Sequence, residues 1–251
     1  IANDPKGIKN NSLIVANPAF NLIKNNNEKN LDKNIIEPNQ KRSIDLKKIK
    51  WESLPGTELE GKAITRLIEG KLLTKEKASV LNIQNEPSPK VLHIASHSYF
   101  LPNKKNTENP LLKSGVVLAG ANEPNSNPFD DGYLTALEVA KLNLQNTELV
   151  VISGCESIQG DFMTGEGVYG LKRAIAVAGA SSSLLSLWKV SDQATALFME
   201  SYYKKLVRGD SRAEALSSTQ EEFKNHTNYS FRHPYVWAAF QLSGDWRPIS
   251  F

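Results

Sequence analysis

Two short, strongly apolar runs constrain the fold most, because each leads to a residue that can do chemistry. Val91-Leu-His-Ile-Ala-Ser-His97, with a strand predicted at 90–96, ends on a histidine, and Glu148-Leu-Val-Val-Ile-Ser-Gly-Cys155 ends on the only cysteine of the chain. Apolar runs of this length are typical of buried strands in a parallel sheet. Functional groups of α/β proteins collect beyond the carboxyl ends of such strands. The two runs therefore predict an imidazole and a thiol at one edge of a sheet.

The other apolar segments alternate between strand-like and helix-like patterns. Besides the two runs, strands are predicted at 12–17, 114–119, 180–187 and 238–242, and helices from 57 and at 75–84, 134–141, 166–178, 192–208 and 211–225. Strands that alternate with helices favour a mostly parallel central sheet with helices on both faces. Because no repeat or boundary interrupts the pattern, residues 1–251 are interpreted as a single α/β domain.

Local signals refine these boundaries. Thr57 with Glu60, and Thr135 with Glu138, have the spacing of a capping box at a helix start. Polar segments at 22–50, 102–113, 120–132 and 156–165 are interpreted as loops between elements. Gly154, next to the cysteine, is expected to let another group approach the backbone closely.

Composition excludes several classes of function. The formal charge is only +3 and the lysines form no dense stripe, so the sequence predicts no direct binding to nucleic acid. No run of about 18 apolar residues predicts a membrane span. One cysteine allows no intramolecular disulfide and no thiolate zinc site, which favours a reducing, cytoplasmic compartment. The first residue is Ile1, without a signal-peptide pattern, which indicates a fragment of a longer protein.

The thiol and imidazole admit more than one interpretation. A free cysteine is most often a small buried hydrophobe, whereas a thiol beside an imidazole can act as a nucleophile with its base. His93 lies within the apolar run and is interpreted as a core histidine hydrogen-bonded to its surroundings. His97 lies at the end of the run, where a base can reach into a cleft. A metal site at the two histidines is disfavoured, because no acidic residue is near them in sequence.

Other segments carry weaker signals. Gly165-Glu-Gly-Val-Tyr-Gly170 lacks the lysine and hydroxyl ending of a nucleotide-binding loop, and it is interpreted as a loop that passes into a helix. Trp188 and Asp192 follow a predicted strand and can line the same cleft as Cys155. Their structural alternative is a core tryptophan and a helix-capping aspartate.

Several segments, taken in order, resemble the CHAT family, a caspase-like domain often found behind tetratricopeptide repeats. The similar segments are Leu13-Ile-Val-Ala-Asn-Pro-Ala-Phe20, Leu54-Pro-Gly-Thr-Glu-Leu-Glu60, His93-Ile-Ala-Ser-His97, Asp131-Gly-Tyr-Leu-Thr-Ala-Leu-Glu-Val139, Leu149-Val-Val-Ile-Ser-Gly-Cys-Glu-Ser157, Gly165-Glu-Gly-Val-Tyr-Gly-Leu-Lys-Arg-Ala174, Ser186-Leu-Trp-Lys-Val-Ser-Asp192 and His233-Pro-Tyr-Val-Trp-Ala-Ala-Phe240. The resemblance covers about 12–246.

The resemblance implies a caspase-like three-layer α/β sandwich and a cysteine endopeptidase related to caspases and separases. It places the general base at His97, the nucleophile at Cys155, and the oxyanion hole at the amides of Ser98 and Cys155. The separation of 155 − 97 = 58 positions is near the roughly 50 of caspases. The family usually has glycine where this chain has Ser98, and alanine where it has Gly154.

The substrate-binding residues implied are Asp192, Trp188 and Ser153. Asp192 matches an acidic position of separases near the pocket for a basic P1 side chain, although Lys189 stands where separases tend to carry another acid. No metal and no cofactor are expected. The expected partners are a protein substrate and an upstream repeat domain or regulatory protein. The resemblance further suggests a role in bacterial defence or signalling.

Three competing functions remain open. The chain is either an active endopeptidase or a catalytically silent caspase-like module that serves for docking. A hydrolase or acyltransferase for small thioesters or amides would use the same cysteine and histidine chemistry. A closed pocket would favour that third reading, whereas an open groove would favour a peptide substrate.

Overall fold

The computed structural model describes residues 11–22, 46, 49–86, 88–101, 109–127, 129–154 and 166–251. Cys155 lies outside the described residues, as do most of the predicted loops at 22–50, 102–113 and 156–165.

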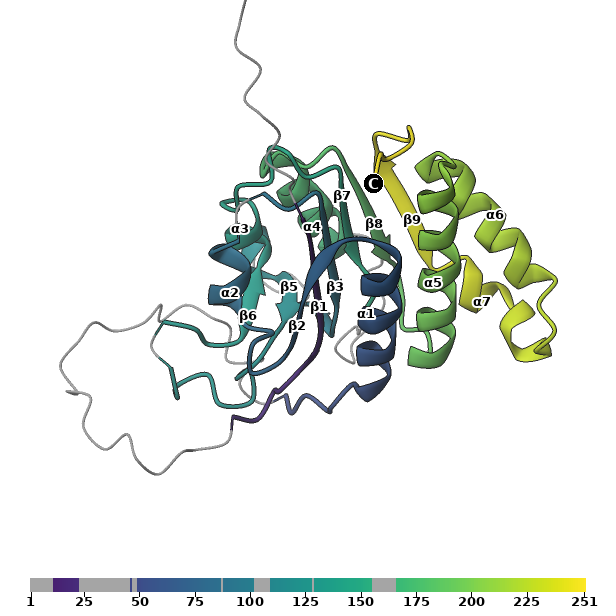
Figure 1. The fold of residues 1–251 in the computed structure, drawn as a ribbon. Coiled ribbons are helices and arrows are strands. Elements are labelled where there is room, and N and C mark those ends of the chain that lie inside the picture. The colour runs from purple at the N-terminus through teal and green to yellow at the C-terminus, as the bar shows by residue number, and fades with distance from the viewer. Residues whose placement is uncertain are drawn as a thin grey trace, which may run out of the picture.

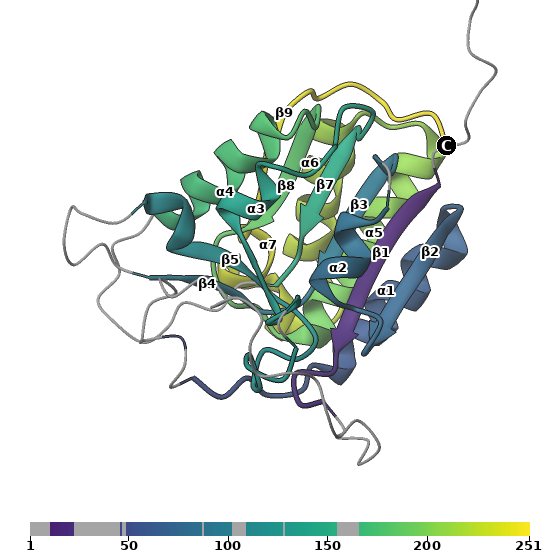
Figure 2. The ribbon, with the colours of Figure 1, turned by 90° about the vertical axis from the view of Figure 1, so that its left-hand side faces the viewer.

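A six-stranded sheet forms the centre of the molecule. Its strands follow the order β2 (Gly70–Lys75), β1 (Ser12–Pro18), β3 (Val91–Ala95), β7 (Leu149–Ile152), β8 (Ser182–Ser186) and β9 (Phe240–Gly244). All neighbours pair in parallel except β8 and β9, which are antiparallel. The carboxyl ends of β3, β7 and β8 therefore meet at one edge of the sheet (Figure 2).

Helices cover both faces of this sheet (Figure 1). One face packs against α2 (Val80–Gln84), α3 (Ala136–Val139) and α4 (Glu166–Val177). The other packs against α1 (Pro55–Leu67) and α5 (Asp192–Arg208), with α6 (Arg212–Lys224) and α7 (Pro234–Trp237) beyond them. Side chains of the central strands alternate between the two layers, as expected for strands buried on both sides.

A small antiparallel sheet begins directly after His97. It has the order β4 (Ser98–Phe100), β5 (Ser114–Val117) and β6 (Tyr133–Thr135). Short 3₁₀ segments cover Pro110–Leu112 and Tyr229–Arg232. Because β4 continues the chain of β3 into this second sheet, the backbone around His97 is held from both sides.

The architecture confirms the predicted three-layer α/β sandwich and corrects some local predictions. The box at Thr135 and Glu138 caps α3, as predicted. The box predicted at Thr57 and Glu60 is wrong, because α1 begins two residues earlier and Leu54 precedes it without a side-chain cap. The predicted helix at 75–84 is also too long, since β2 occupies its start and α2 covers only its last turn.

Candidate active site

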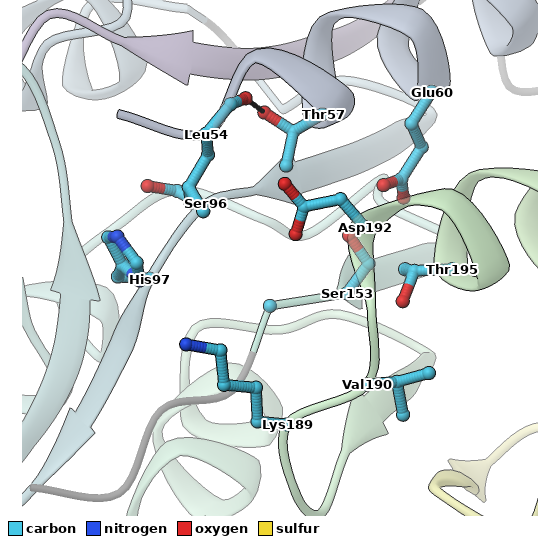
Figure 3. A pocket seen from close by; sticks show the side chains of 11 residues that line it. Leu54, Thr57, Glu60, Ser96, His97, Ser153, Lys189, Val190, Asp192 and Thr195 are labelled. Atoms are coloured by element: carbon cyan, nitrogen blue, oxygen red, sulfur yellow. Dashed lines mark hydrogen bonds between the residues drawn. The ribbon is translucent and has the colours of Figure 1, made fainter. Parts of the chain in front are cut away.

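A pocket opens at the carboxyl ends of β3, β7 and β8, between the N-terminal ends of α1 and α5 (Figure 3). Its cavity volume is about 30 Å³, within about 380 Å³ of space that includes open solvent. Its lining residues are Leu54, Thr57, Glu60, Ser96, His97, Ser153, Gly154, Lys189, Val190, Asp192 and Thr195. The edge of the sheet where the sequence predicts chemistry is therefore hollowed.

His97 lies at this pocket with its ring orientation set by a backbone group. Nε2 is 2.9 Å from the carbonyl oxygen of Glu52. Because a carbonyl only accepts, this contact assigns a proton to Nε2. In the neutral imidazole the lone pair is then on Nδ1, which is the nitrogen that can act as a base.

Two aromatic rings hold the His97 imidazole. The centroids of Phe20 and Trp51 each lie 5.2 Å from that of His97, and both rings are buried. Trp51 is itself fixed, since its Nε1–H donates to the hydroxyl of Tyr133 at 3.0 Å. Sequence reasoning gave no role to Phe20 or Trp51, because nothing in their neighbourhood links them to a histidine dozens of residues away.

Ser98 begins β4, and its amide points away from the β5 ladder. Val117 N donates to the His97 carbonyl and Leu101 N to the Lys113 carbonyl, so alternate residues of β4 face β5. Ser98 pairs with Val116 at a position where β4 and β5 exchange no hydrogen bonds, so its N–H points away from β5. Its hydroxyl donates to the Gly154 carbonyl at 2.8 Å. The side chain thereby links the two strand ends.

Gly154 has no room for a side chain. A Cβ built there would lie 1.7 Å from the Ser96 carbonyl oxygen. The predicted close approach at this glycine is confirmed, and the group that approaches is the backbone of the His97 segment. Cys155, the next residue, lies outside the described part of the chain.

Two of the predicted substrate-binding residues line the pocket. Ser153 is buried, and its hydroxyl oxygen has no hydrogen-bond partner among the described residues. Asp192 is the first residue of α5, which Ser191 caps, and it packs so closely on α1 that a Cβ at Gly56 would lie 2.5 Å from its own Cβ. Lys189 reaches the rim of the same pocket.

Trp188 lies elsewhere. Its indole N–H donates to the carbonyl of Tyr235 at 2.7 Å, and the two rings are 5.8 Å apart. It is half-buried against the α5–α7 layer and is not among the residues that line the pocket.

A buried polar chain, of which the sequence predicted only the histidine, runs from the pocket into the core, and Glu60 is its one member in the pocket lining. His93 Nε2 lies 2.9 Å from Glu60 Oε1, and His93 Nδ1 lies 3.1 Å from the hydroxyl of Tyr203. All three residues are at most 1% exposed. The prediction of a hydrogen-bonded core histidine is confirmed, and Glu60 faces this histidine instead of capping α1.

No group of three or more His, Cys, Asp or Glu side chains is arranged to hold a metal ion within the described ranges. None of the described helices is both long and apolar enough to cross a membrane.

The sandwich of parallel strands and helices, with a histidine at one strand end, defines the chain as a caspase-like α/β domain. The model of the CHAT domain family matches residues 2–245. The chain belongs to the CHAT domain family.

Two mammalian proteins are similar to the chain. It is 33% identical over 117 residues to human tetratricopeptide repeat protein 28, a match that covers 47% of this chain and 5% of that protein. The mouse tetratricopeptide repeat protein 28 is 27% identical over 216 residues, covering 77% of this chain and 9% of the relative. The chain thus spans less than a tenth of the length of these relatives.

Proposed function

We propose that the domain is a cysteine endopeptidase in which Cys155 is the nucleophile and His97 its base. The observation that carries this proposal is the position of His97 at the same pocket as Gly154, the residue before Cys155. The Glu52 carbonyl, which fixes the proton on Nε2, supports the role of Nδ1 as the base. The open pocket favours a peptide chain over a small enclosed substrate.

In the proposed reaction, His97 Nδ1 takes the thiol proton and the Cys155 sulfur attacks the carbonyl carbon of the scissile peptide bond. An ordinary thiol, with a pKa of about 8.5, is only a few per cent ionised at neutral pH, so the imidazole raises its reactivity. When the tetrahedral intermediate collapses, the C–N bond breaks and His97 returns the proton to the leaving amine. Water, deprotonated by His97, then hydrolyses the thioester and regenerates the thiol.

The proposed oxyanion hole consists of the amides of Ser98 and Cys155. The direction of the Ser98 N–H, away from β5, supports this assignment, because an oxyanion needs a donor that the sheet has not used. The Ser98 hydroxyl is directed to the Gly154 carbonyl, which leaves the amide as the group offered to substrate.

The substrate site is proposed at the pocket lined by Ser153 and Asp192, with the carboxylate of Asp192 favouring a basic P1 side chain. Carboxylates bind a guanidinium through two parallel hydrogen bonds. The location of Trp188 against Tyr235 gives it a structural role in the α5–α7 layer in this scheme, apart from substrate contact.

The partners proposed are a protein substrate and a repeat domain or regulatory protein in the same chain or complex. The names of the mammalian relatives, which contain tetratricopeptide repeats, support an association with repeats. We place this single domain in the cytoplasm. A role in bacterial defence or signalling stays a prediction.

The proposal is tested by labelling the native protein with an arginyl acyloxymethyl ketone and locating the adduct by mass spectrometry. We expect an adduct on Cys155 that disappears in Cys155→Ala and falls by a factor of about 10² to 10⁴ in His97→Ala. His233→Ala, at an exposed histidine, is the matched control and retains labelling. Labelling of Cys155 that is indifferent to His97 would contradict the dyad and favour a silent docking module.

A further inference from the structure

We propose that Glu60 determines P1 specificity together with Asp192, because its buried carboxyl group receives the cationic end of a lysine or arginine side chain. The inference rests on the proposed endopeptidase function and deepens it. Glu60 lies on α1, far in sequence from His97 and Asp192, and its side chain lines the same pocket as theirs (Figure 3).

The hydrogen-bond chain behind Glu60 uses one of its two carboxyl oxygens. Burial raises the pKa of Tyr203 well above its ordinary value, so its hydroxyl stays protonated and donates to His93 Nδ1. His93, accepting at Nδ1, carries a proton on Nε2 and donates it to Glu60 Oε1. The chain of donors therefore ends on Oε1 and leaves Oε2 for another donor.

The second carboxylate oxygen of Glu60 is left without a partner. Oε2 is buried, and no described group hydrogen-bonds to it. Ser153 Oγ, which lines the same pocket and is also buried, lacks a partner as well. A buried polar oxygen without a hydrogen bond is unfavourable. Two such atoms around one open pocket indicate a site completed by a ligand that brings hydrogen-bond donors.

The charge of the pocket selects the kind of donor. Glu60 and Asp192 contribute two acidic side chains to the lining, and Lys189, the only cation among the described lining residues, stands at the exposed rim. A neutral donor would satisfy Oε2 but would bring no positive charge to these two acidic side chains. A lysine or arginine side chain supplies both donors and a positive charge, and its methylene stem suits Leu54 and Val190 on the wall.

The test measures binding without catalysis, in a Cys155→Ala background of the chain. Two peptides are compared by titration calorimetry: one with arginine at P1 and one with citrulline, which has the same shape but no charge. We expect the arginine peptide to bind about 10- to 100-fold more tightly, as for hydrogen bonds to a charged group. In Glu60→Gln, which can still accept from His93, this preference falls about tenfold, and the remainder is due to Asp192.

Matched variants separate the inference from the proposed function. Glu58→Gln removes the same charge from the same helix, but Glu58 does not line the pocket, and the arginine preference is expected to persist. A preference retained in Glu60→Gln, or equal binding of both peptides before the substitution, overturns the role of Glu60. Iodoacetamide alkylation of Cys155, which needs no P1 group, is run beside it. Alkylation that does not depend on His97 overturns the endopeptidase instead.

Discussion

His93 and His97 stand four residues apart, and the chain holds them in opposite ways. His93 lies in the middle of β3, with side chains from α1 and α5 on both ring nitrogens and no exposed surface. His97 lies beyond the strand end, with a backbone carbonyl on Nε2 and aromatic rings around it. A histidine bonded by side chains on both nitrogens ties elements together. Because the Glu52 carbonyl holds a proton on Nε2 of His97, the lone pair of the neutral imidazole is on Nδ1.

The largest effect is expected from removing the buried histidine. His93→Ala leaves Glu60 and Tyr203 with unpaired buried polar groups and a cavity, so the free energy of unfolding should fall by about 3–5 kcal/mol. His97→Ala, at the pocket, should cost about half of that or less. Urea unfolding of the two variants checks the difference. Equal losses, or a larger loss at His97, would erase the distinction between the two histidines.

A second test uses alkaline pH to probe the buried polar chain around His93. Burial raises the pKa of Tyr203 and, against the opposing charge of Arg212, that of Tyr202. A raised folded-state pKa means that stability is fully present below the unfolded pKa of about 10 and is lost as pH rises beyond it. Each tyrosine should then cost about 1.4 kcal/mol per pH unit above pH 10.

The variant for this test is Tyr203→Phe. It should halve the pH slope of the free energy of unfolding between pH 10 and 11, measured by urea unfolding. At neutral pH it loses only the hydrogen bond to His93, about 1 kcal/mol. If Tyr203→Phe leaves the pH slope of the free energy of unfolding unchanged, Tyr203 ionises without destabilising the fold.

The aromatic support of His97 gives a smaller effect. Trp51→Leu removes one ring from the imidazole and should lower the rate of Cys155 alkylation by about tenfold, because the base is less well positioned. Trp246→Leu, at an exposed tryptophan, serves as the control. If the alkylation rate stays at its original value, the carbonyl of Glu52 alone is sufficient to orient His97.

The smallest effect concerns the contact between Ser98 and Gly154. Gly154→Ala is expected to be destabilising, because the new Cβ meets the Ser96 carbonyl while the Gly154 carbonyl is tied to the Ser98 hydroxyl. Ser98→Gly removes that tie and lets the backbone shift. A double-mutant cycle of unfolding free energies should therefore show a coupling of about 0.5–1.5 kcal/mol. Strict additivity would mean that the two positions vary independently.

The fold was largely predictable because its long elements have clear periodicity. The central strands β1, β3 and β7 are short apolar runs, and α5 and α6 have apolar residues at helical spacing. The strands β4 and β6 have three residues each, too few to display an alternation. β2 was missed because its neighbours in the sequence resemble a helix and only its pairing with β1 makes it a strand.

Only the part of the site that lies at the ends of recognisable strands could be predicted from the sequence. The placement of His97 and Gly154 at neighbouring strand ends follows from two apolar runs. Glu60 has the local spacing of a capping residue, and its true partner, His93, lies 33 positions away, so no local pattern links them. Phe20 and Trp51 contact His97 from positions that are also far away in the sequence. Hydrophobic periodicity predicts local elements and carries no information on such contacts.

The buried polar chain of Glu60, His93 and Tyr203 also affects when the pocket is completed during synthesis. The ribosome adds His97 and Cys155 before it adds α5, whose first residue follows Cys155 by 192 − 155 = 37 positions. At about 5–20 residues per second, the nascent chain carries a thiol and an imidazole for seconds without the helix that closes the pocket. Until Tyr203 emerges, no residue of the later part of α5 packs on the face of β3 that carries His93. Any activity of this pocket therefore begins only after most of the domain has left the ribosome.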